Sequence, residues 1–204
     1  MDGIRDMIAG ERAELAEVLA GLPAPSWDEP TLCAGWRVRE VVAHITMPFR
    51  YSGRRFAFEL ARSRGKFNAM ADRCARRDGT ALSPAELAAA LAANVFHPWK
   101  PPGGGDVGAL THDVIHGLDI TEALGLARRV PEDRLGVVLP NLATPKARNF
   151  FGVDLSGIEL RASDTAWAFG SGTPVTGTAQ DLALFLSGRK LPPGRLGSAP
   201  EDRG

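Results

Sequence analysis

The stretch LTHDVIHGLDITEALG, residues 110–125, is the most informative part of this chain. Its apolar residues recur at helical spacing and cover most sides of a helix expected to run from about Val107 to Leu124 and to end at Gly125. His112 and His116 lie four residues apart, so their side chains project from one face of that helix. Because most of the other positions are apolar, we expect the histidine face to lie in the protein interior.

Two histidines one helical turn apart are typical of helical metal sites, because their imidazoles can fill adjacent coordination positions. His44 is the third candidate ligand, since it lies inside the apolar run of another expected helix. Three neutral imidazoles around one divalent ion leave a position open for water or substrate. Asp119 follows His116 by three residues and could orient an imidazole. The residue pattern alone leaves open that these are hydrogen-bonded core histidines. The fourth histidine, His97, is expected in a loop and not as a ligand.

The composition excludes several classes of protein. Acidic and basic residues balance at 24 each in 204 residues, which argues against electrostatic binding of nucleic acid or of an anionic membrane. Cys33 and Cys74 belong to no paired motif. The N-terminus carries charges where a signal peptide needs an apolar core, and no stretch approaches the roughly 20 apolar residues of a membrane span. The sequence predicts a cytoplasmic protein with no nucleic-acid or membrane partner, and it is compatible with a homodimer.

The pattern along the chain predicts a mainly α protein. Capping Ser83 begins one helix, and Pro48 should kink another. Two short runs with strand character, in residues 158–164 and 165–169, precede a helix that Gly188 closes. The remaining helices are expected over residues 2–22, 37 to the low 60s (the kinked helix), 67–76 and 132–148. We expect a helical bundle over 1–150, a small α+β segment with a strand pair and a helix over 151–191, and a disordered tail over 192–204.

Three segments resemble the mycothiol-dependent maleylpyruvate isomerase family, a branch of the DinB-like four-helix-bundle metalloproteins. PTLCAGWRVREVVAHI, residues 30–45, is similar to the family signature in which a tryptophan-containing turn opens a helix with the first histidine ligand. HDVIHGLDITEALG, residues 112–125, is similar to the segment with the other two ligands and a trailing aspartate. RASDTAWAFGSGTPVTGTAQDLALFLSGR, residues 161–189, resembles the C-terminal segment. The resemblance implies a DinB-like four-helix bundle with a small C-terminal α+β appendage.

The resemblance also implies a ligand set. His44, His116 and Asp119 match the family pattern directly, whereas the isomerase carries a glutamate where this chain has His112. An all-histidine set is familiar in the wider DinB-like superfamily. The C-terminal region is shorter than the second domain of the isomerase, so maleylpyruvate is not the expected substrate.

The implied activity is that of a divalent-metal-dependent transferase or isomerase that uses mycothiol and acts on a small electrophilic molecule. Zinc is the expected metal by ligand type, with nickel as the alternative. Two other functions use the same site: a non-catalytic metal- or ligand-binding bundle, and a metal-dependent hydrolase. A metal-free hydrolase-like or interaction protein with structural histidines is the remaining alternative. Cys33 is expected to be packed and not reactive, and four aromatic residues could line a pocket: Trp36, Phe49, Trp99 and Trp167.

Overall fold

A computed structural model describes residues 2–198 of the chain. These residues divide into two compact units, with the boundary between Ala127 and Arg128. The boundary therefore lies earlier than the expected one at residue 150, and the elements that follow Arg128 belong to the second unit. Of the tail expected to be disordered, residues 199–204 lie outside the described residues, while residues 192–198 form turns and a short strand.

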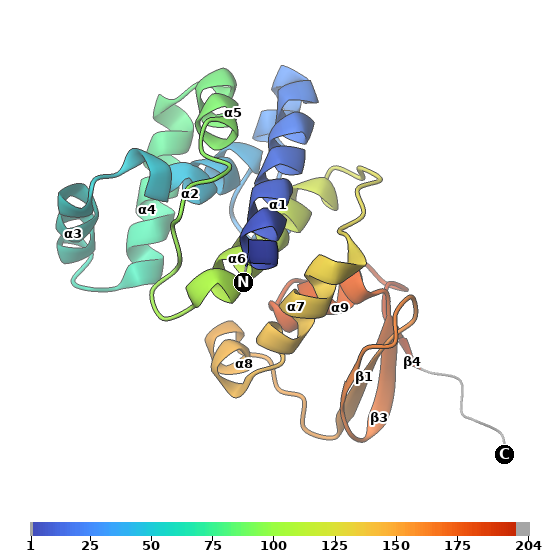
Figure 1. Cartoon of the computed structure of the whole chain (residues 1–204). Coiled ribbons are helices and arrows are strands. Elements are labelled where there is room, and N and C mark those ends of the chain that lie inside the picture. Colours follow the sequence, from blue (N-terminus) through green and yellow to red (C-terminus); the bar gives the residue numbers. More distant parts are fainter. Residues whose placement is uncertain (1, 199–204) are drawn as a thin grey trace, which may run out of the picture. The chain divides into compact units, whose positions relative to one another are not determined.

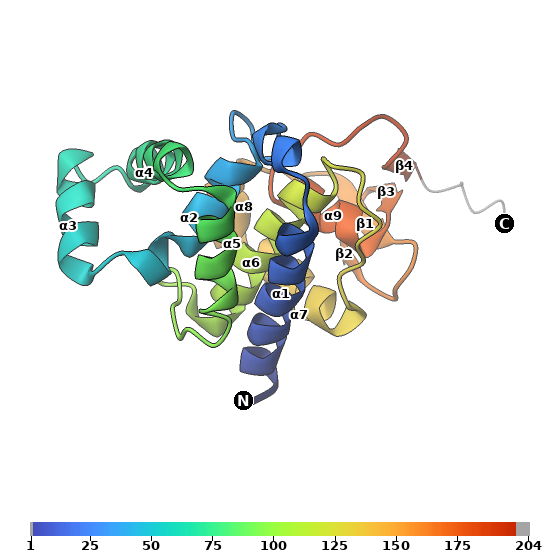
Figure 2. The same ribbon diagram turned by 90° about the horizontal axis from the view of Figure 1, so that it is seen from above.

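The first unit contains the helices that carry the histidines. In chain order its elements are α1 (Asp2–Gly21), the 3₁₀-helix η1 (Ala24–Asp28), α2 (Val38–Arg50), α3 (Gly53–Arg62), α4 (Phe67–Ala81), α5 (Pro84–Ala92) and α6 (Gly105–Thr121). Helix α1 packs against α5 and α6, and α2 packs against the same two helices, so these four close into a bundle (Figures 1 and 2). The mainly helical fold is thus confirmed. No helix among residues 2–198 is long and apolar enough to cross a membrane.

The bundle core consists of side chains from all four helices. Leu19 of α1, Val41 of α2, Leu87 of α5 and Ile120 of α6 are buried in one apolar cluster. Burial of each such side chain stabilises the fold by about 1.5–3 kcal/mol. The apolar run around His44 that the sequence marks is therefore part of the core.

The expected kinked helix from Arg37 to the low 60s is instead two helices. Helix α2 contains Pro48 but ends at Arg50, and Tyr51 has an extended backbone (φ −103°, ψ 129°). Ser52 then caps α3 by accepting a hydrogen bond from the Arg55 backbone N–H (3.3 Å). A serine that can cap a new helix thus separates the two.

Helix α4 is longer than the expected 67–76 and passes through Gly79 to Ala81. Gly79 packs against α2, where a Cβ atom would lie 3.3 Å from the Arg39 carbonyl oxygen. This glycine therefore allows close helix packing and does not end the helix. Helices α3 and α4 form an extension on the α2 side of the bundle, with α3 outermost (Figure 2).

Buried Glu59 of α3 joins these two helices. Its carboxylate accepts from Arg73 (2.6 Å) and Arg77 (2.5 Å) of α4. The hydrogen bond from Arg77, together with that from Arg73, holds the pKa of Glu59 below its usual value, although burial acts in the opposite direction.

The second unit consists of α7 (Glu132–Leu142), α8 (Pro145–Phe151), β1 (Ile158–Ala162), β2 (Ala168–Gly170), β3 (Thr173–Gly177), α9 (Ala179–Leu186) and β4 (Gly197–Ser198). The helix expected over 132–148 is two helices, because Thr144 caps a new one at Pro145. The sheet order is β2-β1-β3-β4, with β1 antiparallel to β2 and parallel to β3. The expected strand pair and the helix that ends near Gly188 are confirmed.

Strand β3 lies in GSGTPVTG, residues 170–177, a stretch whose glycines and proline are typical of turns. Gly172 precedes it with φ +129°, and a Cβ atom there would lie 2.2 Å from the Gly157 carbonyl oxygen. Only glycine fits this close approach, so the glycines that suggest a loop in the sequence are what brings β3 beside β1.

We predict that Glu59→Gln lowers the free energy of unfolding at pH 7 by about 1–3 kcal/mol, because two arginines lose an ionised partner. A carboxylate whose pKa is lowered in the folded state stabilises the protein above its unfolded pKa of about 4.3. That stabilisation is lost as the pH falls through the lower, folded value. Urea unfolding at a series of pH values should therefore show the variant and the wild type converging in acid.

The exposed Glu17→Gln in α1 is the matched control, with an expected change within about 0.5 kcal/mol. A Glu59→Gln difference that is the same at every pH would contradict the role of the ionised carboxylate.

Candidate metal centre

The three histidines meet between α2 and α6. His44 lies on α2, and His112 and His116 lie on α6. One ring nitrogen from each of the three lies within 4.8 Å of the other two, and the Nε2 atoms of His44 and His112 are 3.1 Å apart. His44 is 8% exposed, and the side chains of His112 and His116 are 16% and 12% exposed. The cluster is therefore largely buried, and part of the His112 and His116 side chains is accessible to solvent.

The local sequence explains why these side chains converge. On α2, His44 lies among Val41, Val42 and Ile45, which are buried in the bundle core. The one-turn spacing on α6 points His112 and His116 the same way. The turn before α2 is tied to α6 by a hydrogen bond from the Leu32 N–H to the Asp119 carbonyl (3.1 Å).

Two carboxylates hold the outer nitrogens of the α6 imidazoles. Nδ1 of His116 lies 3.0 Å from Oδ2 of Asp119, and Nδ1 of His112 lies 2.9 Å from Oδ1 of Asp113. An ionised carboxylate only accepts hydrogen bonds, so each Nδ1 carries the proton and donates it. Each Nε2 then has a lone pair, which is the state of a histidine that binds a metal ion.

Asp119 thus takes the orienting position that its spacing suggested, whereas sequence reasoning missed Asp113. The available signal was an acidic residue next to a candidate ligand on a helix with apolar residues on most sides. It is weak, because consecutive residues on a helix do not face each other.

The donor set fits a divalent ion. Zinc–imidazole bonds of about 2.0–2.1 Å place neighbouring ligand nitrogens about 2.9–3.4 Å apart, for octahedral to tetrahedral angles. The 3.1 Å between the Nε2 atoms of His44 and His112 lies in this interval. Two oriented imidazoles and a third from another helix match the ligand type that zinc and nickel prefer.

Two tryptophans flank the histidines. The Trp36 ring lies 5.0 Å from that of His44 and 6.4 Å from that of His116, and its indole N–H is held by Asp72 (2.8 Å). The Trp99 ring lies 5.0 Å from that of His112. The other two aromatic candidates lie elsewhere: Phe49 packs on His97, and Trp167 stacks on Phe169 in the second unit.

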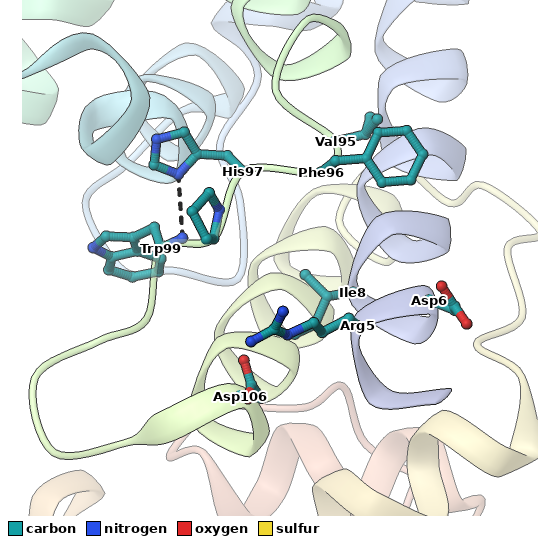
Figure 3. Close-up of a pocket in the computed structure, with 9 residues that line it drawn as sticks. Arg5, Asp6, Ile8, Val95, Phe96, His97, Trp99 and Asp106 are labelled. Atoms are coloured by element: carbon teal, nitrogen blue, oxygen red, sulfur yellow. Dashed lines mark hydrogen bonds between the residues drawn. The ribbon is translucent and has the colours of Figure 1, made fainter. Parts of the chain in front are cut away.

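Trp99 also lines a pocket of about 140 Å³ (Figure 3). Its walls come from α1, from the segment 95–99 and from the start of α6: Arg5, Asp6, Ile8, Val95, Phe96, His97, Pro98, Trp99 and Asp106. His97 lies in this segment, as expected for a loop residue, and its Nδ1 accepts from the Trp99 backbone N–H (3.2 Å). Burial, and then the charge of Arg12, lower the pKa of His97, which favours its neutral form.

A second group of potential ligands shares His116. The thiol of Cys33, a ring nitrogen of His116 and a carboxylate oxygen of Asp119 lie within 4.8 Å of one another. An ion in this group would compete with the Nδ1–H of His116 for the carboxylate of Asp119. The histidine triad requires no such change, so it is the better cation site.

Substitutions distinguish the two groups. We predict that His112→Ala abolishes stoichiometric zinc binding, whereas Cys33→Ser leaves the dissociation constant within about threefold of wild type, because only the first removes a ligand of the triad. Competition of the purified protein with a chromophoric chelator measures both constants. The opposite result would assign the ion to the Cys33 group.

The chain is similar to known proteins in sequence and in fold. Residues 8–96 match the family model described as the mycothiol maleylpyruvate isomerase N-terminal domain. The uncharacterized protein Rv0036c of Mycobacterium tuberculosis H37Rv is 25% identical over 90% of this chain and 84% of its own length, as is MT0041 of strain CDC 1551.

Two solved structures share the fold. The crystal structure of the mycothiol-dependent maleylpyruvate isomerase superimposes with a TM-score of 0.59 at 14% identity, over 97% of this chain and 92% of that one. A mutant of that enzyme gives a TM-score of 0.56 at 13% identity, over 93% and 89% of the two chains. At these identities the likeness shows the fold alone.

Proposed function

The chain carries the N-terminal domain of the mycothiol maleylpyruvate isomerase family over residues 8–96, and from this premise we propose a metal- and thiol-dependent enzyme. It would hold one divalent ion through His44, His112 and His116 and catalyse transfer to, or isomerisation of, a small electrophilic molecule. The observation that carries the proposal is the convergence of three ring nitrogens within 4.8 Å, from two different helices.

The ion would supply acidity. A cation near a thiol lowers the pKa of that thiol, so that a thiolate nucleophile exists at neutral pH. Zinc is the metal we propose because three neutral imidazoles are a donor set typical of catalytic zinc sites, and nickel is the alternative.

The thiol would come from a cofactor, and we propose mycothiol. The family description and the solved relatives carry mycothiol in their names, and this is the support for its choice. Cys74 is buried in another apolar cluster, and Cys33, whose thiol lies within 4.8 Å of a ring nitrogen of His116, is partly buried against the bundle core, so we propose an external thiol.

The residues of the chain would orient the ligands and limit access of water. Asp113 and Asp119 keep the Nδ1 protons of the two α6 histidines and so direct each Nε2 inward. Trp36 and Trp99 form apolar walls on two sides of the cluster. We propose that a small substrate reaches the site along Trp99, beside the pocket of Figure 3.

Two further functions would use the same donors. A hydrolase would need only a water molecule in the open position, and a non-catalytic binding protein would need no reactive ligand there. The partial exposure of His112 and His116 favours a site that a small molecule can reach over a closed structural one.

Metal content is the first test. Protein expressed without an affinity tag and purified without chelator should contain about one equivalent of zinc or another divalent ion by plasma mass spectrometry. His44→Ala and His116→Ala should reduce it below about 0.2 equivalents. His97→Ala is the matched control, because it removes the one histidine outside the cluster and should retain the metal. Wild-type protein below about 0.2 equivalents would refute the metalloenzyme.

Thiol chemistry is the second test. Addition of mycothiol to the cobalt-substituted protein should shift the visible spectrum, because sulfur ligation of the ion adds a charge-transfer band. Mycothiol-dependent loss of a model electrophile should then exceed ester or amide hydrolysis by the same protein. An unchanged spectrum would favour the binding protein, and hydrolysis without thiol would favour the hydrolase.

A further inference from the structure

Arg12 of α1 makes a set of contacts that stability alone does not explain. The residue is 1% exposed, and its Nε donates to Oδ2 of Asp113 (2.7 Å). Its Nη1 donates to the carbonyls of His97 (2.7 Å) and Val95 (3.5 Å), and the guanidinium lies over the Phe49 ring, 5.0 Å from the centroid. One buried cation therefore contacts α6, α2 and the segment that leads into α6.

A buried ion pair is a poor way to add stability. Asp113 is 2% exposed, so both charges have lost their water, and an apolar pair of similar volume would often serve the fold equally well. The contacts of the pair point instead to a role in positioning its neighbours. Asp113 uses its two oxygens separately, one for Arg12 and the other for His112.

The carboxylate that orients His112 needs a second contact to keep its own orientation, whereas the carboxylate that orients His116 does not. Asp119 follows His116 by three residues, a spacing at which side chains on a helix meet. Asp113 is adjacent to His112, where side chains diverge by about 100°. The guanidinium of Arg12 fixes the plane of the Asp113 carboxylate from the opposite side, and this keeps Oδ1 on the Nδ1 proton of His112.

The same guanidinium holds one wall of the pocket. The Val95 and His97 carbonyls that it binds belong to the segment drawn in Figure 3, which continues into Trp99. The Trp99 ring packs on the His112 ring. Arg12 thus reaches His112 by two routes, through the Asp113 carboxylate and through the backbone before Trp99.

We propose that Arg12 is a positioning residue for the metal centre, setting the direction of His112 Nε2 and coupling it to the pocket wall formed by residues 95–99. The inference rests on the proposed metal function. Arg12 belongs to α1, a helix that contributes no ligand to the triad, and through Arg12 an ion at the triad would order residues 95–99.

Three variants test the proposal. Arg12→Met keeps the length of the side chain and removes the charge and the donors. Arg12→Lys keeps the charge. Its single ammonium nitrogen cannot contact the Asp113 carboxylate and the two backbone carbonyls together, as the planar guanidinium does. Arg73→Met is the matched control, since it removes an arginine from buried Glu59 and touches neither the histidines nor their carboxylates.

Zinc affinity by chelator competition is the main measurement. We expect Arg12→Met to bind zinc about 10–100-fold more weakly, Arg12→Lys to be intermediate and Arg73→Met to match the wild type. Hydrogen exchange of residues 95–99 should slow when zinc binds to the wild type and not when it binds to Arg12→Met. Zinc affinity of Arg12→Met within about twofold of wild type would overturn the proposal.

If Arg12→Met does not unfold cooperatively, the double variant Arg12→Met, Asp113→Leu replaces it, because no unpaired buried charge remains in it. It should fold and show the same loss of zinc affinity, and wild-type affinity in it would equally overturn the proposal.

A measurement on the metal-free protein separates failure of the Arg12 proposal from failure of the proposed metal function. If the wild type binds no zinc, long-range ¹H–¹⁵N spectra of the metal-free protein still decide the role of Arg12. The His112 ring should be the Nδ1–H tautomer in the wild type and in Arg73→Met, and a mixture in Arg12→Met. An unchanged tautomer in Arg12→Met would overturn the positioning role.

Discussion

The contact between α2 and α6 at His44 and His112 is the constraint on which the rest of the site depends. Two helices that are distant in sequence must pack closely enough to place the Nε2 atoms of these residues 3.1 Å apart. Apolar neighbours such as Val41 of α2 and Leu118 of α6 are fully buried and supply the driving force for that packing. The polar cluster is therefore held by the core around it, and its own hydrogen bonds set only the orientation of the rings.

Each polar group that is buried needs a hydrogen-bond partner, and the partners in this cluster fix which way the imidazole rings face. Asp113 and Asp119 take the Nδ1 protons, so the outer sides of two imidazoles are satisfied by the protein. Structural histidines would explain these contacts equally well. They explain less well why a ring nitrogen of each histidine converges with those of the other two, since only one proton can lie between His44 and His112, whereas a divalent ion accepts every lone pair of the cluster.

The family match and the candidate centre overlap only in part. The matched segment, residues 8–96, includes Arg12 and His44 and ends before α6, which carries the other two histidines. The solved relatives share the fold over nearly the whole chain at 14% and 13% identity. The ligand set therefore rests on the geometry of this chain, where His112, unlike a carboxylate ligand, needs a second group to place its proton.

The sequence by itself determined the helical class, the inward faces of the helices and the set of histidines, because periodicity and one-turn spacing are local properties of a helix. It also marked Asp119, three residues from His116, and a strand pair expected in residues 158–164 and 165–169, which the structure places at 158–162 and 168–170. Only the tertiary structure decided the boundary at Ala127, strand β3 and the positions of Arg12 and Asp113. Each of these depends on contacts between segments far apart in the chain, and neither helical period nor neighbour spacing carries information about such contacts.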